Sequence, residues 1–293
     1  ESSWASKSIL NVTGGTFKGG YNCYGMGPGV EPDDAQINIK GGNFNSNPAN
    51  YVVAGYESVE ENGAWTVGKP QALVEFEAAI AQGGNVTLAA DITLLESVVI
   101  EGKKVVLDLN GKTVSAPLFS AFEVKSGAEL TIKNGKVVSG DKNWCAISAA
   151  AVNGNQITLN LENVEVESNK EGDCAVKSFS GAVINAKNVT VTSNAGGGFY
   201  AAGGEIVLDN CSAICTGATS WFVPLSISSS GKMTVNSGSY TIEPVDAANG
   251  QYLAYVMNSG GELVINGGTF NGTVASGNAL KACGLICADT GAK

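Results

Sequence analysis

Short apolar segments that alternate with polar residues recur along most of the chain and predict β-strands. Typical examples are Val106–Leu109, Leu130–Lys133 and Leu159–Glu162, each followed by an Asn or an Asn-Gly pair. A period of two is the pattern of a strand with one buried face, and Asn and Gly favour the turn that follows. The sequence therefore predicts many short strands joined by tight turns.

These strand ends repeat at a regular interval, which predicts the architecture. The corners at positions 111, 135, 163, 188, 210, 237 and 267 are 24, 28, 25, 22, 27 and 30 residues apart. Repeats of this length are typical of solenoids. Each corner is followed by a second alternating segment, and most are preceded by another turn. Three short strands per coil indicate an all-β chain folded as a parallel β-helix.

The region from Tyr51 to Gln82 joins two segments of opposite kind. Tyr56–Val67 places an Asn-Gly turn between two short strands, which predicts a closing hairpin over about 55–67. Leu73, Val74, Phe76, Ala79 and Ile80 have helical spacing and predict an opening helix over about 71–82. A closing hairpin that precedes an opening helix indicates two domains, 1–68 and 71–293.

The helix, the strands Gly84–Leu94 and Lys104–Val114, and the Gly-Gly-Thr-Phe corners resemble a known family. They resemble right-handed parallel β-helix proteins of the pectate-lyase-like superfold, and most of all its non-enzymatic, adhesin-type members on the surfaces of bacteria and their phages. This resemblance implies a capping helix at the start of the body and an extracellular setting.

Residues 1–68 have the sequence pattern of last coils. Leu10–Phe17 and Ile37–Phe44 match Val264–Phe270, and two coils with a hairpin are too few repeats to be stable alone. The segment 281–287 begins a further coil at the other end. The link 68–70 reaches about 10 Å, whereas the body is about 40 Å long at the ~4.8 Å spacing of strands.

We therefore expect residues 1–68 of one molecule to complete the body, 71–293, of another copy. Such contacts build filaments unless the rotation closes. In this arrangement Cys23 lies opposite Cys283 in the next coil. The alternatives are a piece cut from a tandem array and an arbitrary fragment.

Composition narrows the function classes. The net charge is −10, there is no His, and all 17 basic residues are Lys. An acidic chain without Arg disfavours nucleic acid and anionic membrane surfaces as partners. No apolar run is long enough for a membrane span, so membrane insertion is not expected. The chain is expected to be extracellular, at a cell surface or in a phage particle.

Seven cysteines leave at least one thiol free or paired between molecules. Cys145 and Cys174 occupy matching positions of adjacent coils, where they stack or bond. Cys211 and Cys215 align with core valines and are expected to be small apolar core residues. Cys-x3-Cys pairs without His are poor zinc ligands, so no metal and no cofactor are expected.

Catalysis is not expected. Enzymes of the family that the chain resembles use an Arg or Lys base with calcium-binding carboxylates, or several Asp with a His. The chain has neither His nor Arg, and without imidazole the Ser-His-Asp and Cys-His systems are excluded. Two carboxylates alone still suffice for glycoside hydrolysis. The candidates, among them Asp141, Asp173 and Asp289, are interpreted as solvated acids in turns.

Glycan binding is the other chemistry to weigh. Trp144, Trp221, Phe222 and Tyr252 come nine or ten residues before a Gly turn, so they are candidates for a row on which sugar rings stack. The competing interpretation is an aromatic ladder in the core. We expect the protein to be a non-catalytic rod segment of a surface fibre. Its expected partners are other copies of itself and, if the fibre is an adhesin, glycans or a host surface. The alternative is a carbohydrate-binding or carbohydrate-active module of the tailspike or polysaccharide-lyase type.

Overall fold

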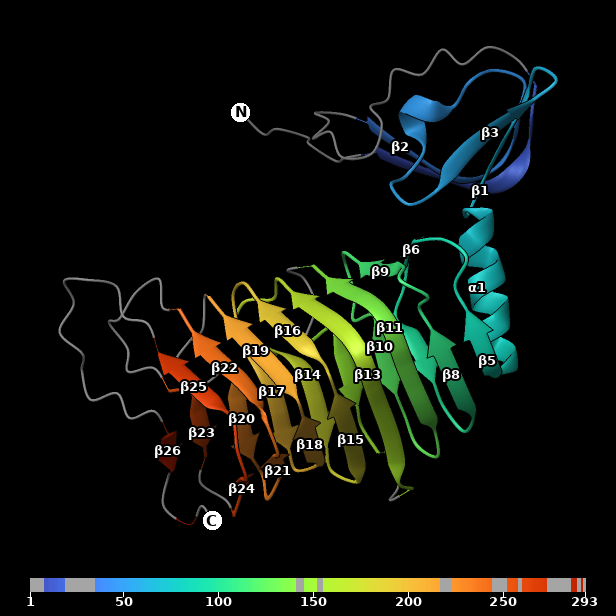
Figure 1. The fold of residues 1–293 in the computed structure, drawn as a ribbon. Helices are drawn as coiled ribbons and strands as arrows, with labels where there is room; N and C mark the ends of the chain where they lie inside the picture. Colours follow the sequence, from blue (N-terminus) through green and yellow to red (C-terminus); the bar gives the residue numbers. More distant parts are fainter. Residues whose placement is uncertain are drawn as a thin grey trace, which may run out of the picture. The chain divides into compact units, whose positions relative to one another are not determined.

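The computed structural model describes residues 8–18, 35–140, 145–151, 155–216, 223–243, 252–257, 260–272, 286–288 and 291. The chain divides into two compact units, Glu1–Glu75 and Phe76–Lys293, called here the N-terminal unit and the body. Figure 1 shows both. None of the described helices has the length and apolar content that crossing a lipid bilayer requires.

The N-terminal unit is a sheet with the strand order β1-β2-β4-β3. Strands β1 and β2 are parallel, whereas β4 runs antiparallel to both β2 and β3. Ile37, Ile39, Phe44 and Val67 form its small buried core. The elements are β1 (Ser8–Phe17), β2 (Ala35–Phe44), the 3-10 helix η1 (Ala49–Tyr51), β3 (Glu57–Glu61) and β4 (Ala64–Gly68).

The predicted hairpin is confirmed in β3 and β4. Asn62 and Gly63 connect them with φ angles of 55° and 79°. Positive φ at both central residues is the signature of a type I′ turn, whose twist fits a two-residue hairpin. Because β4 pairs with β2 and Val67 is buried, the hairpin covers one side of the two parallel coils.

The body is a parallel β-solenoid of about nine turns, which confirms the fold class that the repeats predict. It begins within the helix α1 (Gln71–Gln82), which confirms the expected helix. Each complete coil contributes one strand to each of three faces. The strands β11 (Glu129–Ser139) and β13 (Ile157–Ser168) bend around a corner and serve two faces.

The first face contains, besides the leading halves of β11 and β13, the strands β5 (Gly84–Thr87), β8 (Lys104–Asp108), β15 (Ala182–Lys187), β18 (Glu205–Asp209), β21 (Lys232–Val235) and β24 (Glu262–Ile265). The second contains their trailing halves with β6 (Ile92–Thr93), β9 (Thr113–Ala116), β16 (Thr190–Ser193), β19 (Cys211–Cys215), β22 (Gly238–Ile242) and β25 (Thr269–Gly272). The third contains β7 (Val98–Ile100), β10 (Phe122–Val124), β12 (Ile147–Ala149), β14 (Cys174–Phe179), β17 (Gly197–Ala202), β20 (Leu225–Ser228), β23 (Ala254–Val256) and β26 (Ile286–Ala288).

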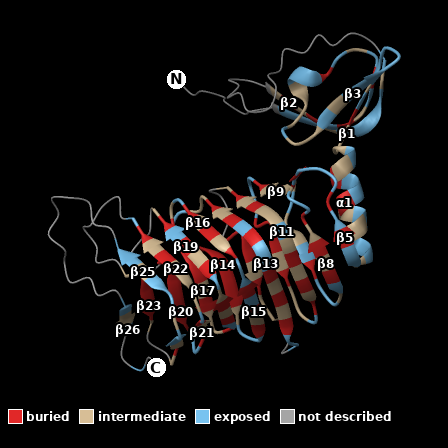
Figure 2. Ribbon diagram, in the orientation of Figure 1, coloured by how far each residue is buried: buried red, intermediate tan, exposed pale blue. Residues whose placement is uncertain are grey.

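Alternate side chains of every face point into the solenoid and form the core. Leu130 in β11 pairs in register with Leu159 in β13, and both are fully buried. Figure 2 shows the resulting stripes of buried and half-buried residues along the body. The alternation read from the sequence is therefore the division between the core and the outer surface.

Asn side chains hold the corner between the first and second faces. Asn163, Asn188 and Asn210 have φ angles of 54°, 53° and 51°, in the left-handed region that Asn tolerates better than most residues. The amide of Asn188 donates to Oδ1 of Asn163 at 2.9 Å, and that of Asn210 donates to Oδ1 of Asn188 at 2.8 Å. The ladder ties successive coils together.

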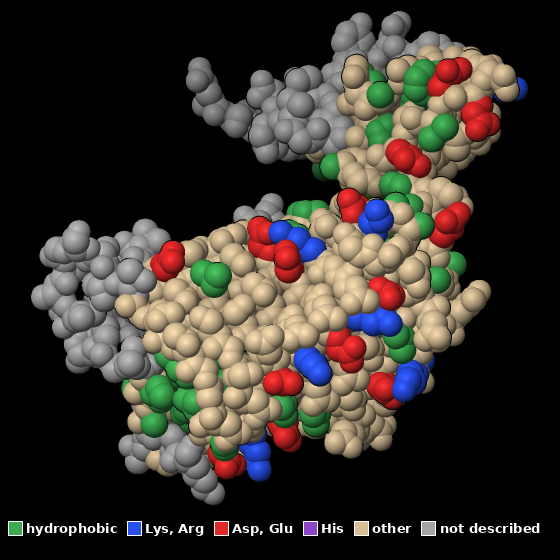
Figure 3. Space-filling view, viewed as in Figure 1, with side chains coloured by type: hydrophobic (Ala, Val, Ile, Leu, Met, Phe, Trp, Pro, Cys, Tyr) green, Lys and Arg blue, Asp and Glu red, His purple; other side chains and the backbone are tan. Residues whose placement is uncertain are grey.

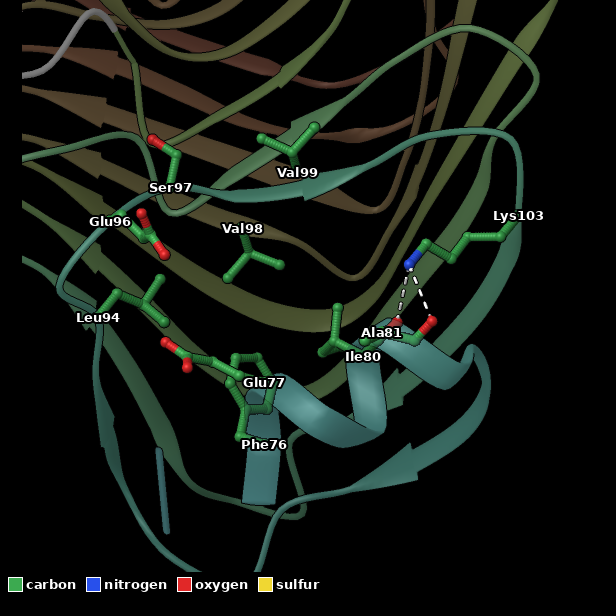
Figure 4. Close-up of a pocket in the computed structure, with 10 residues that line it drawn as sticks. All are labelled: Phe76, Glu77, Ile80, Ala81, Leu94, Glu96, Ser97, Val98, Val99 and Lys103. Carbon is green, nitrogen blue, oxygen red and sulfur yellow. Dashed lines mark hydrogen bonds between the residues drawn. The ribbon is translucent and has the colours of Figure 1, made fainter. Parts of the chain in front are cut away.

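The helix α1 packs against the first coil of the body. Phe76 and Ile80 are buried, and with Leu94 they line a cavity of about 190 Å³ (Figure 4). Lys103 Nζ donates to the carbonyl oxygens of Ile80 and Ala81, each at 3.2 Å. A cation at the carboxyl end of a helix satisfies terminal carbonyls and complements the helix dipole. This end of the core is closed.

Candidate functional site: two unpaired sheet edges

The last described coil of the body leaves its core side chains open. Leu263 and Ile265 pair with Met233 and Val235, which are buried inside the preceding coil. Ile265 itself is 36% exposed, and Leu263 is only half-buried. Among the described residues, β24 and β25 have no strand on their outer side. An apolar strand edge of this kind is a template for another chain.

The N-terminal unit has the complementary defect at β1. Leu10 and Val12 pair with Ile37 and Ile39, which are buried in β2, yet Leu10 is 56% exposed. In the described part of the chain, β1 pairs only with β2. The strand has ten residues, Ser-Ile-Leu-Asn-Val-Thr-Gly-Gly-Thr-Phe, and no charged side chain. No charge on its side chains protects the edge.

The opposite edge of the same sheet is protected. Strand β3 has the sequence Glu-Ser-Val-Glu-Glu, and Glu57, Glu60 and Glu61 are exposed. Charged residues on an edge strand prevent pairing with other chains. One edge of the N-terminal unit is therefore blocked, and the other is apolar.

The corners of the two open edges are of the same kind. Gly268, between β24 and β25, has a φ of 126°, and Gly15, in β1, has a φ of 105°. An aromatic residue follows two positions later in each case, Phe270 and Phe17. Phe270 stacks on Tyr240 with ring centroids 5.3 Å apart, and Phe44 stacks on Phe17 at 4.9 Å.

Charges are spread over the outside of the coils. Figure 3 shows Lys and carboxylate side chains scattered over the body, many of them adjacent. The ion pairs between coils include Lys104–Glu129 at 2.6 Å and Lys136–Glu167 at 2.8 Å. Within the described ranges, no cluster of three or more Cys, Asp or Glu has the geometry to hold a metal ion.

Asp173 is not the solvated turn acid that the sequence indicates. It is only 7% exposed, and its carboxylate contacts Lys177 Nζ at 2.6 Å. Lys177 also lies over the rings of Phe179 and Tyr200, 5.6 and 5.3 Å from their centroids. The flanking Gly172 turn gives Asp173 the local pattern of a surface loop, and that pattern does not show that Lys177 pairs with it.

The predicted alignment of Cys145 with Cys174 follows from the pairing of Ile147 with Val176, two residues later in each coil. Both cysteines are buried free thiols, so no disulfide joins them. Burial raises the pKa of the Cys145 thiol to about 11, and burial also raises that of Cys174. Cys211 and Cys215 are buried as well, which confirms their place in the core. Cys23 and Cys283 lie outside the described residues.

The candidates for glycan stacking are only partly covered by the structure. Trp144, Trp221 and Phe222 lie outside the described residues. Tyr252 is half-buried and stacks on Tyr255 with centroids 5.3 Å apart, next to the core. Its role toward sugars stays a prediction.

The fold and the two edges define a β-solenoid repeat protein with unpaired apolar strands. A scan against protein-family models, a search of curated proteins and a search of solved structures found no match for the chain. The resemblance to the pectate-lyase-like superfold stays a prediction from the sequence.

Proposed function

We propose that the protein is a non-catalytic structural rod unit that assembles head to tail, with the N-terminal unit of one copy extending the body of the next. The observation that carries the proposal is the match between the two open edges. Each edge ends a parallel solenoid stack with its core side chains exposed, and each has the same Gly corner followed by a stacked aromatic ring.

The direction of the two stacks supports assembly. In the N-terminal unit β4 pairs with Gly42–Phe44 of β2, and among the described strands β1 has no neighbour on its outer side. In the body α1 packs on the first coil, and the last described coil is open. Adding β1 of one copy to β24 and β25 of another makes one longer solenoid. Helix α1 caps its first end and the β3–β4 hairpin caps its last end, and a complete solenoid requires such terminal caps.

A second copy is the partner that the chain length favours. Strand β24 is seven strands from β5 along the first face, which is about 34 Å at ~4.8 Å per strand. Lys69 and Pro70, between β4 and α1, span about 10 Å with their flanking bonds. Contact between the two edges is therefore assigned to different molecules.

An extracellular position, at a cell surface or in a fibre, belongs to the same proposal. Its support is the resemblance seen in the sequence. The chain also has no Arg, which leaves trypsin-like proteases only Lys as cleavage sites. Glycans or a host surface are the further partners proposed for such a fibre.

The test is the mass of the purified chain at low and high concentration, with electron microscopy of the concentrated sample. We expect rods that lengthen with concentration. Leu10→Asp places a charge on the open edge and is expected to abolish the rods while the melting temperature stays unchanged. Val59→Asp is the matched control, because Val59 is also exposed, at 46%, but lies on β3. A single-chain mass at every concentration contradicts the proposal.

A further inference from the structure

We infer that the copies join in one parallel register, in which Leu10 of one copy lies beside Leu263 of the next and Phe17 lies beside Phe270. This inference rests on the proposed assembly and specifies its interface. Strand β1 then continues the first face next to β24 and, after its corner, the second face next to β25.

The alternation of side chains restricts the register to every second position. Leu263 and Ile265 point inward, because they pair with the buried Met233 and Val235. Leu10 and Val12 point inward for the same reason, since Ile37 and Ile39 are buried. A slip of one residue would place each inward side chain opposite an outward one.

The corner then selects one position among those that remain. Gly238 and Gly268 have φ angles of 133° and 126° in the body, and Gly15 and Gly42 have 105° and 127° in the N-terminal unit. Other residues rarely adopt such angles. Gly268 aligns with Gly238 in the body and Gly15 with Gly42 in the N-terminal unit, so placing Gly15 on Gly268 continues the glycine corner from one stack into the other.

This register produces a continuous aromatic column. In each of four coils, the aromatic residue follows the last inward aliphatic residue by five positions. The four pairs are Val235 and Tyr240, Ile265 and Phe270, Val12 and Phe17, and Ile39 and Phe44. Tyr240 and Phe270 are stacked with an angle of 23° between their planes, and Phe17 and Phe44 with 9°. Joining the edges places Phe17 on the open side of Phe270.

Shape and charge agree with the same placement. Strand β1 spans ten residues, Ser8–Phe17, and β24 and β25 with their corner span Glu262–Gly272. Glu262 is the charged residue of β24 and β25. Its side chain points outward and, in the inferred register, faces Ile9 and not another carboxylate. Nothing on β1 repels this edge.

Cysteine cross-linking tests the register. Asn11 and Val264 point outward, are exposed, and face each other in the inferred pairing. Directly opposed residues on neighbouring strands, about 4.8 Å apart, are within disulfide reach. The double variant Asn11→Cys/Val264→Cys is expected to give ladders of multimers on mild oxidation, seen on non-reducing gels. Asn11→Cys/Glu262→Cys is the control, because it reports a slip of two residues on the same face.

At least tenfold more multimer from the Val264 pair than from the Glu262 pair supports the register. The parent chain and each single variant give the background from the native cysteines. Rods that cross-link through the Glu262 pair, or through neither pair, overturn this register and leave the proposed assembly standing. A single-chain mass for the parent at every concentration overturns both.

Discussion

Lys177 and Asp173 form an ion pair in which Nζ lies 2.6 Å from Oδ1 and 2.8 Å from Oδ2, with both side chains almost closed to solvent. Oδ1 also accepts the backbone N–H of Cys174 at 2.7 Å. The two charges are four positions apart on β14 and the turn before it, within the middle coils of the body. Removing one partner leaves the other as an uncompensated buried charge.

We expect Asp173→Asn to lower the free energy of unfolding by about 3–5 kcal/mol. The double variant Asp173→Asn/Lys177→Met removes both charges, keeps an acceptor for Cys174 N–H, and places an apolar side chain near the rings of Phe179 and Tyr200. It is expected to recover most of the loss. Urea unfolding followed by circular dichroism gives both values. Equal losses in the single and double variants would contradict the role of the ion pair.

The Asn ladder gives a second prediction. Asn188 combines a left-handed backbone with two ladder hydrogen bonds, to Asn163 and from Asn210. Asn188→Ala is expected to cost about 2–5 kcal/mol, from ~1–2 kcal/mol of backbone strain and ~0.5–1.5 kcal/mol for each of the two lost hydrogen bonds. Asn188→Gly removes the hydrogen bonds without the steric strain at positive φ, so it should cost less than Asn188→Ala. Thermal unfolding of the two variants, measured side by side, separates the cost of backbone strain from the cost of the lost hydrogen bonds.

The buried thiols predict a loss of stability in alkaline solution. The folded state raises the pKa of Cys145 from its ordinary value near 9 to about 11, and burial raises those of Cys174, Cys211 and Cys215 in the same direction. Between these values the unfolded chain has lost protons that the folded chain keeps, so stability falls as the pH rises. The stability is fully present below the ordinary thiol pKa, near 9, and is lost as the pH rises through the folded-state pKa values.

The measurement is the urea midpoint at pH 7.0, 8.5 and 9.5. The midpoint is expected to fall between the last two values, and Cys145→Ala is expected to reduce that fall. Cys145 accounts for about 3 kcal/mol once the pH exceeds its folded-state pKa of about 11, at ~1.4 kcal/mol per unit of pKa. A second measurement is alkylation at pH 8. The reagent should label the buried cysteines only after the protein has been unfolded. Rapid labelling of Cys145 in the folded protein would refute the assignment.

The sequence predicts those features that depend on local pattern. The hairpin at Asn62-Gly63, the helix over 71–82 and the three strands per coil follow from turn chemistry and from periods of two and 3.6. These signals lie within a few residues of one another. Each was therefore readable without knowing what packs against it.

Other features depend on residues far apart in the chain. Asp173 and its Gly172 turn have the local composition of a surface loop, yet the carboxylate is buried against Lys177, which lies over the ring of Tyr200 in the next coil. The open edges are similar, since Leu10 and Leu263 read as ordinary core residues of their strands. Their exposure becomes visible only when the pairing order shows which strands have a neighbour on one side alone.

The glycine corner gives the last prediction, because it constrains both the body and the proposed interface. Gly238 has a φ of 133°, and an added Cβ would overlap the backbone carbonyl of Cys211 in the coil below. Gly238→Ala is expected to lower the free energy of unfolding by about 3 kcal/mol or more, from strain and displaced backbone together.

Gly111 is the matched control, because its φ is also positive, 74°, but an added Cβ would have nothing within 4 Å. Gly111→Ala should cost only the ~1–2 kcal/mol of the left-handed conformation. Comparable losses at the two positions, measured by urea unfolding, would mean that the coils do not stack closely at this corner, and the placement of Gly15 on Gly268 would lose its basis.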